Sequence, residues 1–304
     1  MTTEKTIGLI GLGIMGGAIA ANLLNSGFRV VGFDVDPERC AALAGIGVDI
    51  ATSPQDVVLA ARIVLTSLPN EKALATVTRA IVEAAATRRT IIEMSTMTIE
   101  AKQAAESVLS GAGHIMLDCP LSGTGAQAKT KDLTVYSSGD SSVIADCAPV
   151  FAAFARLHFD LGAFGNGSRM KYIANLLVFV HNVAAAEALV LAMKAGLDPA
   201  RVIEVVKQGA GGSRMLEVRG PVMAAGEFDK VTAGFPMYYK DLSVITQFAM
   251  GLDCPTPLLS ATVPIYLAGG AAYPKCDVAA VCGVLETMAG VKRPPKADLA
   301  PPPT

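Results

Sequence analysis

The sequence predicts an α/β fold in which a doubly wound parallel sheet is followed by a long helix and then by an all-α region. Short apolar runs alternate with helix-forming segments in the first half, and a long apolar stretch follows from Gly165 to Gly196. No long alternating strand pattern interrupts the remainder. We therefore expect a sheet domain at residues 1–164, an interdomain helix at 165–196, an all-α domain at 197–290 and a proline-rich tail at 291–304.

Length and composition limit the functional classes. With 304 residues the chain is long enough for two domains, and its net charge of -2 gives no electrostatic reason to expect nucleic acid or a membrane surface as a partner. The mean hydropathy of +0.46 is high for a soluble protein and favours buried helices and an apolar subunit interface. Because the N-terminal residues have no extended apolar signal segment and lead directly into a strand, we expect a cytoplasmic protein.

The cysteines and histidines do not indicate a metal site. None of the six cysteines has CxxC spacing, and all of them lie in scattered apolar contexts. The three histidines share no metal-ligand spacing. We expect no metal, and we interpret the cysteines as buried free thiols and not as disulfides or zinc ligands.

The first strand, Thr6 to Ile10, leads into a glycine-rich turn and an Ala- and Leu-rich helix. Gly11, Gly13 and Gly16 form a GxGxxG pattern, in which two glycines bring the backbone close to a pyrophosphate and the third lets the helix pack on the strand. We expect this turn to bind a dinucleotide, and its remaining residues are counted with the cofactor site: Leu12, Ile14 and Met15.

The second strand, Arg29 to Phe33, ends in Asp34, eighteen positions after Gly16. A carboxylate at this place can accept hydrogen bonds from the adenosine ribose hydroxyls and would repel a 2′-phosphate. We therefore expect NAD in preference to NADP. The alternative interpretation of Asp34 is an ordinary cap at the end of a strand.

Further apolar runs predict the rest of the sheet: Ile63–Ser67, Thr90–Glu93, His114–Leu117, Thr134–Ser137 and Leu157–Phe159. Ligands of doubly wound sheets bind beyond the carboxyl ends of the strands, which draws attention to the loops that follow three of these runs. These loops contain Leu68-Pro69-Asn70, Met94-Ser95-Thr96 and Pro120–Ala126. The small residues of the third loop leave backbone N–H groups able to hold a carboxylate, although a plain small-residue turn explains them equally well.

The long apolar stretch contains a pair of polar residues, Lys171 and Asn175, that share one face of a helix about one turn apart. We expect these two side chains to take part in the chemical reaction. For Lys171 alone, a helix-start lysine that extends to solvent is the competing interpretation. The stretch also contains His181, Asn182 and Glu187, and polar groups of this kind are costly at bilayer depth, so we expect no membrane span. Four further helical segments are expected: Pro199–Lys207, Tyr239–Met250, Leu258–Leu267 and Val278–Ala289.

With these residues in place, the chain resembles the β-hydroxyacid dehydrogenases, a family that includes 3-hydroxyisobutyrate dehydrogenase, tartronate semialdehyde reductase and, more distantly, 6-phosphogluconate dehydrogenase. The likeness follows the family motifs in order over nearly the whole chain. GLGIMGGAIAANL resembles GLGxMGxxMAxNL, EMST at Glu93–Thr96 resembles DxST, and DCPLSG at Asp118–Gly123 resembles DAPVSGG. In the second half, GNGSRMKYIAN resembles GxGxxxKxxNN, and Lys240-Asp241-Leu242 resembles KDL.

This resemblance implies a Rossmann domain, a long interdomain helix, an all-α domain and a homodimer or homotetramer. It implies an NAD-dependent dehydrogenase of a small 3-hydroxy acid, with Lys171 as catalytic acid/base and Asn175 placing the substrate. The resemblance also implies that Ser122, Gly123 and Thr124 bind the substrate carboxylate. Thr96 and Lys240 match positions that line the cofactor and substrate pocket. A lysine that acts as a base at neutral pH needs burial or a nearby cation, and Lys240 is the expected cation.

The chain also departs from the family pattern. Thr124 replaces the second glycine of SGG, Gln127 and Lys131 replace later glycines, and Ala174 replaces the first asparagine after the lysine. Val178 stands where the 6-phosphogluconate branch has a proton-donating glutamate, so we expect hydride transfer without decarboxylation.

Two alternative functions share this fold. Reduction of imines or semialdehydes is the first, although the imine-reducing group usually lacks the residue that matches Lys171. The second is a non-catalytic NAD-binding protein, which the absence of a basic arm or appended reader domain disfavours.

Overall fold

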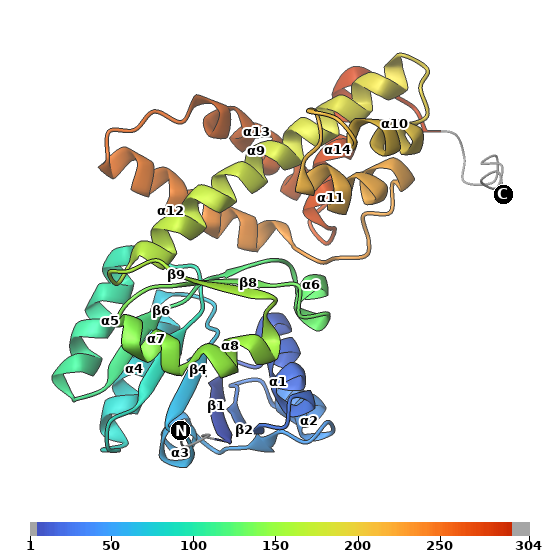
Figure 1. Ribbon diagram of the computed structural model, residues 1–304. Helices are drawn as coiled ribbons and strands as arrows, with labels where there is room; N and C mark the ends of the chain where they lie inside the picture. The colour runs from blue at the N-terminus through green and yellow to red at the C-terminus, as the bar shows by residue number, and fades with distance from the viewer. Residues whose placement is uncertain (1–4, 294–304) are drawn as a thin grey trace. The chain divides into compact units, whose positions relative to one another are not determined.

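The computed structural model describes residues 5–293, and the chain divides into two compact units, Met1–Ala174 and Asn175–Thr304 (Figure 1). This division falls inside the long helix, and the domain limits expected from the sequence stay predictions. Beyond Arg293, the expected proline-rich tail lies outside the described residues.

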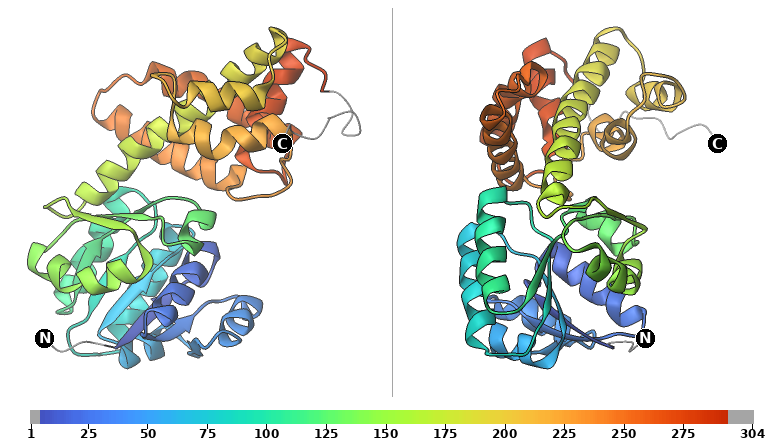
Figure 2. Two further views of the ribbon diagram at one scale, coloured as in Figure 1. Left: turned by 45° about the vertical axis from the view of Figure 1, so that its right-hand side comes forward. Right: turned by 60° about the vertical axis from the view of Figure 1, so that its left-hand side comes forward.

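The first unit contains a six-stranded parallel sheet with the strand order β3-β2-β1-β4-β5-β6, which confirms the predicted doubly wound arrangement. The order reverses between β1 and β4, the point at which such sheets bind ligands. The strands are β1 (Thr6–Ile10), β2 (Arg29–Phe33), β3 (Asp49–Ile50), β4 (Ile63–Thr66), β5 (Thr90–Glu93) and β6 (Ile115–Asp118). The helices between them, which Figure 2 shows on both faces of the sheet, are α1 (Ile14–Asn25), α2 (Pro37–Ala44), α3 (Pro54–Ala60), α4 (Glu71–Glu83) and α5 (Ile99–Gly111).

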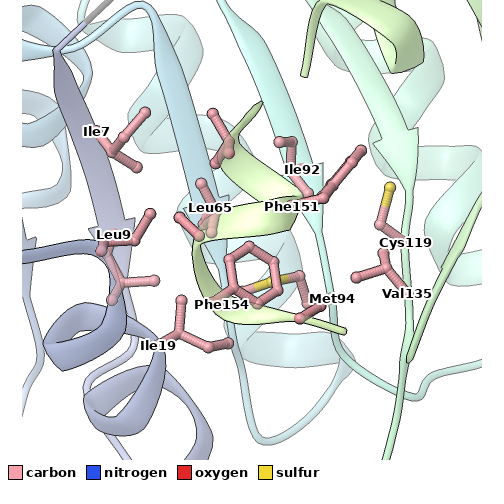
Figure 3. Packing of buried hydrophobic residues seen from close by; sticks show 14 of the residues in the cluster. Ile7, Leu9, Ile19, Leu65, Ile92, Met94, Cys119, Val135, Phe151 and Phe154 are labelled. Atoms are coloured by element: carbon pink, nitrogen blue, oxygen red, sulfur yellow. The ribbon is translucent and has the colours of Figure 1, made fainter. Parts of the chain in front are cut away.

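Both faces of this sheet are buried because side chains alternate along each strand. On β1, Ile7 and Leu9 point into the cluster shared with α1 (Figure 3), and Ile10 belongs to the cluster on the opposite face with α3, α4 and α5. Phe151 and Phe154 fill the first cluster from the helix α8 (Ala148–Phe154). The carboxyl ends of β1, β4 and β5 are therefore held rigidly side by side.

The last predicted strands do not join this sheet. A separate three-stranded sheet has the order β7-β8-β9, with β7 antiparallel and β9 parallel to β8. Strand periodicity shows which residues alternate but not which strand is the partner, so the sequence pattern placed all strands in one sheet. These strands are β7 (Leu121–Ser122), β8 (Thr134–Ser137) and β9 (Leu157–Asp160), and the helices beside them are α6 (Gly125–Lys129) and α7 (Ser141–Asp146).

The predicted long helix is present as α9 (Asn166–Lys194). By length and composition alone it could cross a membrane, a test that the core helix of a soluble protein also passes. Two of its amide side chains bond within the second unit: the Asn175 amide donates to Asp241, and the Asn182 amide donates to the Tyr266 hydroxyl at 3.1 Å and the Val278 carbonyl at 3.3 Å. These bonds favour the core-helix interpretation.

Helices make up the described part of the second unit, in agreement with the prediction. They are α10 (Pro199–Val206), α11 (Arg214–Ala225), α12 (Phe235–Gly251), α13 (Pro257–Ala272), the short 3₁₀ helix η1 (Val278–Ala280) and α14 (Val281–Ala289). Helix α11 was not predicted, because it contains Pro221 next to Gly220 and both residues disfavour a helix interior. A buried ion pair between Arg219 and Asp277 fastens this helix to the start of η1.

Candidate active site

Two positions of the glycine-rich turn, Gly11 and Gly16, have room only for glycine. Gly11 has φ +96°, and a Cβ atom there would lie 2.1 Å from the Ser67 carbonyl oxygen. A Cβ atom on Gly16 would lie 1.9 Å from the Gly11 carbonyl oxygen, which locks the turn against the start of α1. Gly13 begins α1 without a side-chain cap, so the first N–H groups of the helix can hold a pyrophosphate.

The residues between these glycines have different surroundings. Ile14 is exposed and Met15 is half-buried, so both can line a bound cofactor. The Leu12 side chain is buried in the core, and its N–H donates to the Asp34 carboxylate at 2.7 Å. Leu12 therefore stabilises the glycine-rich turn from the side of the hydrophobic core. Its side chain and its N–H are both directed to groups of the protein and not to the predicted cofactor.

Asp34 is held tightly beside the glycine-rich turn. Its two oxygens accept from Leu12 N–H and, at 2.9 Å, from Asp36 N–H, and its side chain is only 6% exposed. Arg39, which the sequence interpretation missed, places Nη1 3.6 Å from the Asp34 carboxylate and remains half exposed. The carboxylate suits ribose hydroxyls, whereas the guanidinium offsets part of its repulsion toward a 2′-phosphate.

The two loops after β4 and β5 lie at the same edge of the sheet, because these strands are neighbours. Leu68 donates its N–H to the Ser95 hydroxyl at 2.8 Å, which joins one loop to the other. Pro69 and Asn70 are exposed, and the Asn70 side chain caps α4 by accepting from Ala73 N–H at 2.9 Å. Thr96 is half-buried in the second loop. The structure thus brings Leu68, Pro69, Asn70 and Thr96 to the edge where the glycine-rich turn lies.

The predicted carboxylate loop is more ordered than a small-residue turn. Ser122 pairs with Thr134 in β7–β8, and Gly123 has φ +134°, where a Cβ atom would lie 2.5 Å from the Leu133 side chain. Thr124 caps α6 in a capping box: its N–H donates to the Gln127 side chain at 3.0 Å, and Gln127 N–H donates back to its hydroxyl at 3.4 Å. Thr124 N–H thus already has a partner within the loop, and its role in holding a carboxylate stays a prediction.

The departures from the family pattern have a local explanation in this loop. The Thr-x-x-Gln spacing is the sequence signal of this capping box. Gln127 also donates to Asp132 at 3.0 Å, and Lys131 donates to the Ser26 hydroxyl on the chain just after α1 at 3.0 Å. Lys131 has φ +59°, a conformation that favours glycine, which agrees with the glycine of the family pattern.

Lys171 and Asn175 lie one turn apart on α9, and both are buried, with 9% and 8% of their surface exposed. In the second unit, Asn175 donates its amide N–H to Asp241 Oδ2 at 3.0 Å, and Lys240 on α12 forms an ion pair with Asp241 Oδ1 at 3.1 Å. Because a carboxylate only accepts, Asp241 fixes the orientation of the Asn175 amide. In the sequence, Asp241 is only the middle residue of the KDL motif and is not among the predicted site residues.

The Lys240–Asp241 pair also changes the expected electrostatics. Lys240 was predicted to be a cation that favours the neutral form of Lys171. An ammonium paired with a carboxylate is a much weaker source of positive potential than a lone ammonium. Among residues 5–293, no group of three or more His, Cys, Asp or Glu side chains is placed to hold a metal ion.

Comparisons with known proteins agree with this architecture. The family described as the NAD binding domain of 6-phosphogluconate dehydrogenase matches residues 6–165, and that described as NAD-binding of NADP-dependent 3-hydroxyisobutyrate dehydrogenase matches residues 165–285. L-threonate dehydrogenase of Cupriavidus necator is 32% identical over 300 residues, which cover 97% of this chain and 100% of the relative. 2-(Hydroxymethyl)glutarate dehydrogenase of Eubacterium barkeri is 30% identical over 298 residues, which cover 96% and 98%.

A solved structure of a related dehydrogenase has a similar fold. The 3-hydroxyisobutyrate dehydrogenase of Mycobacterium tuberculosis with L-serine superposes with a TM-score of 0.84 at 28% identity, covering 93% of this chain and 99% of that chain. The glycine-rich turn lies in the part of the chain that the first family matches, and the long helix and the helices after it begin in the part that the second family matches. The chain therefore belongs to the β-hydroxyacid dehydrogenase family, and it is an NAD(P)-dependent oxidoreductase.

Proposed function

We propose that this enzyme transfers a hydride between nicotinamide and a small hydroxy acid, without decarboxylation. The observation that carries the proposal is the burial of Lys171 on an apolar helix, one turn before Asn175. A bound nicotinamide would accept or donate the hydride. Lys171 would take the hydroxyl proton during oxidation and return it to the carbonyl oxygen during reduction.

Asn175 would position the substrate. Since one amide N–H is committed to Asp241, the second N–H and the carbonyl oxygen remain to bind a ligand. The N–H can donate to the reacting oxygen while the carbonyl accepts from a neighbouring hydroxyl. This arrangement suits an acid with more than one hydroxyl, and the similarity to an L-threonate dehydrogenase supports the same substrate class.

The substrate carboxylate would bind at Ser122 and Gly123. We choose the Ser122 hydroxyl and the Gly123 N–H as the donors of this loop, because Thr124 N–H already donates to Gln127 in the capping box. Val178, which is half-buried on α9, has no proton to donate to an enediol. Its apolar side chain supports retention of the carboxylate in the product.

For the cofactor, we propose NAD in preference to NADP. The Asp34 carboxylate lies where ribose hydroxyls would bind, and it repels an additional phosphate. Arg39 limits this preference, because its guanidinium lies 3.6 Å from that carboxylate. We therefore expect a measurable secondary activity with NADP.

A substrate panel tests this proposal. 3-Hydroxyisobutyrate, glycerate, threonate and 2-(hydroxymethyl)glutarate would be supplied with NAD and then with NADP, and nicotinamide absorbance would be followed. We expect turnover of at least one acid with NAD and a product that retains its carboxylate. Turnover of none of them, or exclusive use of NADP, would contradict the proposal.

We also propose a cytoplasmic homo-oligomer. Apolar side chains of the second unit are exposed, and a subunit interface would cover them: Leu191, Met250, Leu258 and Met288. All six cysteines are free thiols, the state that a reducing compartment maintains. Light scattering that shows a monomer would contradict the oligomer, and recovery of the native enzyme in an envelope fraction would contradict the location.

A further inference from the structure

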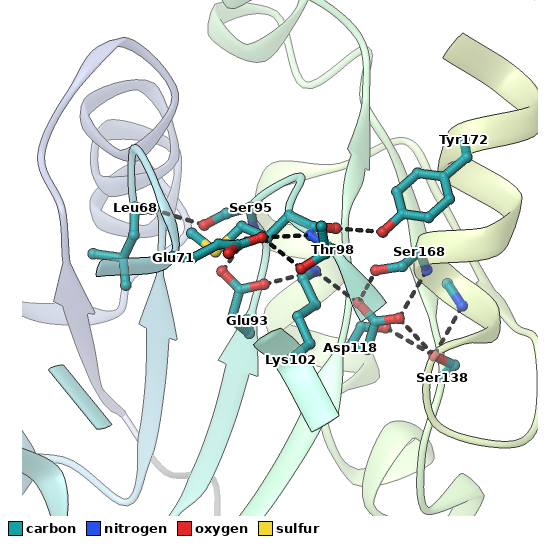
Figure 4. Close-up of polar contacts among 12 residues, drawn as sticks. Leu68, Glu71, Glu93, Ser95, Thr98, Lys102, Asp118, Ser138, Ser168 and Tyr172 are labelled. Atoms are coloured by element: carbon teal, nitrogen blue, oxygen red, sulfur yellow. Dashed lines mark hydrogen bonds and ion pairs between the residues drawn. The ribbon is translucent and has the colours of Figure 1, made fainter. Parts of the chain in front are cut away.

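Three charged side chains without any solvent exposure meet at the carboxyl ends of β5 and β6 (Figure 4). The Lys102 ammonium lies 2.7 Å from a Glu93 oxygen and 2.7 Å from an Asp118 oxygen. Glu93 and Asp118 are direct partners in the β5–β6 register, so without Lys102 the two carboxylates would face one another. One ammonium and two carboxylates leave this cluster, the Lys102 triad, with a net charge of -1.

One arm of the Lys102 triad holds the start of α9. Asp118 accepts from Ser168 N–H at 2.7 Å and from the Ser168 hydroxyl at 2.8 Å. It also accepts from the Ser138 hydroxyl at 3.2 Å, which in turn accepts from Gly167 N–H at 2.9 Å. The buried Asp118 carboxylate, at the end of β6, thus accepts hydrogen bonds from the first turn of α9 as an N-cap side chain would, and its negative charge complements the helix dipole. Lys171 follows Ser168 by three residues, within one turn.

The other arm holds the predicted cofactor loops. Glu93 accepts from Ser95 N–H at 2.9 Å, and the Ser95 hydroxyl accepts from Leu68 N–H at 2.8 Å. Leu68 and Thr96, the residue after Ser95, are predicted to line the cofactor. Lys102 therefore connects the loops that would hold nicotinamide with the helix turn that leads to Lys171.

Stability alone does not explain such an arrangement. Replacing a buried ion cluster by apolar residues is often neutral or stabilising, because desolvation offsets the attraction between the charges. Burial by itself lowers the pKa of Lys102, but Asp118 and Glu93 outweigh it and raise the pKa above its ordinary value. Lys102 therefore stays protonated, and the cluster provides a fixed geometry at two separate backbone segments.

We propose that Lys102 is a positioning residue for hydride transfer: it holds Asp118 against the first turn of α9 and Glu93 against the cofactor loops, and so sets Lys171 relative to the nicotinamide. This proposal rests on the proposed role of Lys171. It assigns no contact with substrate to Lys102, which is fully buried.

The first test uses the two arms as matched single variants. Ser138→Ala removes a bond at the start of α9, whereas Ser95→Ala removes the link to Leu68. We expect Ser138→Ala to lower kcat by about tenfold with an unchanged NADH dissociation constant, since small misplacements near the chemistry are costly. Ser95→Ala should mainly weaken NADH binding. If both variants changed Tm without these separate effects on kcat and NADH binding, the proposal would be overturned.

The second test uses charge. Lys102→Met leaves two buried carboxylates without a cation, so kcat at neutral pH should fall by about tenfold or more and recover as lower pH protonates one carboxylate. Lys102→Met combined with Glu93→Gln restores the net charge of -1, and this double variant should regain activity at neutral pH without acid recovery. Wild-type kcat and pH profile in Lys102→Met, or a double variant no better than the single one, would overturn the proposal.

Two other ionisable groups near the Lys102 triad are not expected to contribute to the pH dependence of kcat in this test. Tyr172 on α9 donates to the Met97 carbonyl, and burial raises the pKa of its phenol. Burial likewise raises the pKa of the Cys119 thiol next to Asp118, so both groups stay neutral. Turnover in Lys171→Met would instead refute the proposed function. An inactive Lys171→Met together with a fully active Lys102→Met would refute only the role of Lys102.

Discussion

Substitution of Gly16 by alanine tests whether the glycine-rich turn binds the cofactor. The added Cβ would lie 1.9 Å from the Gly11 carbonyl oxygen, and real Cβ atoms essentially never approach closer than 3.0 Å, so the turn must open by at least 1.1 Å. Gly11 is also closely packed, because a Cβ atom added to Gly11 itself would lie 2.1 Å from the Ser67 carbonyl oxygen. Overpacking of this kind costs about 1–3 kcal/mol, which corresponds to about a fivefold to 150-fold weaker complex if the cost falls on the bound state.

The neighbouring Gly17 provides the matched control. A Cβ atom there meets its nearest neighbours at 3.6 Å, and alanine favours a helix interior, so Gly17→Ala should keep NADH binding and raise Tm slightly. The NADH affinity of each variant can be measured from the change in NADH fluorescence on binding. Equal NADH affinity in Gly16→Ala and Gly17→Ala would refute the assignment of the turn to the cofactor.

Two further predictions concern the site, and a third concerns the burial of the cysteines. Asp241→Asn frees the Asn175 amide to rotate, and losing a hydrogen bond to a charged acceptor should lower kcat/KM by about tenfold or more while NADH binding persists; an unchanged kcat/KM would argue against the orienting role. Arg39→Gln should reduce NADP use relative to NAD by about fivefold at low salt, as expected for a half-exposed ion pair, and an unchanged ratio of the two kcat/KM values would remove Arg39 from cofactor selection. Iodoacetamide at pH 8 should modify the exposed Cys254 well before Cys147, since burial raises the pKa of the Cys147 thiol to about 12; peptide mass spectrometry showing the reverse order would contradict this burial.

Local patterns in the sequence predicted much of the fold. The strands β1, β2, β5 and β8 begin and end at the predicted residues. Apolar β-branched runs that are bounded by polar or glycine residues leave little choice of where a strand begins and ends. The separate β7-β8-β9 sheet was missed because pairing between strands is a tertiary property. Helix α11 was missed because Pro221 sits inside it, where tertiary contacts such as Arg219–Asp277 override local propensity.

The site shows the same division between local and tertiary information. Spacing along the chain was enough to place Gly11, Gly16 and Asp34 together, since a strand, a turn and a helix fix their geometry. The Lys102 triad could not be predicted in this way. Lys102 lies in a segment whose sequence indicates only that it forms a helix. Its ion-pair partners Glu93 and Asp118 lie up to 16 positions away from it along the chain. Nothing in its local sequence indicated that it would be fully buried.

The most direct test of the central claim is turnover in Lys171→Met, measured with the best acid of the substrate panel and with NADH titration of the same preparation. Methionine keeps most of the apolar stem of lysine but has no proton to exchange. We expect kcat to fall by about 10²-fold to 10⁴-fold, the range typical for loss of a general acid/base, while NADH binds as in the wild type. Wild-type turnover in a Lys171→Met enzyme that binds NADH normally would contradict the assignment of Lys171 as the proton carrier.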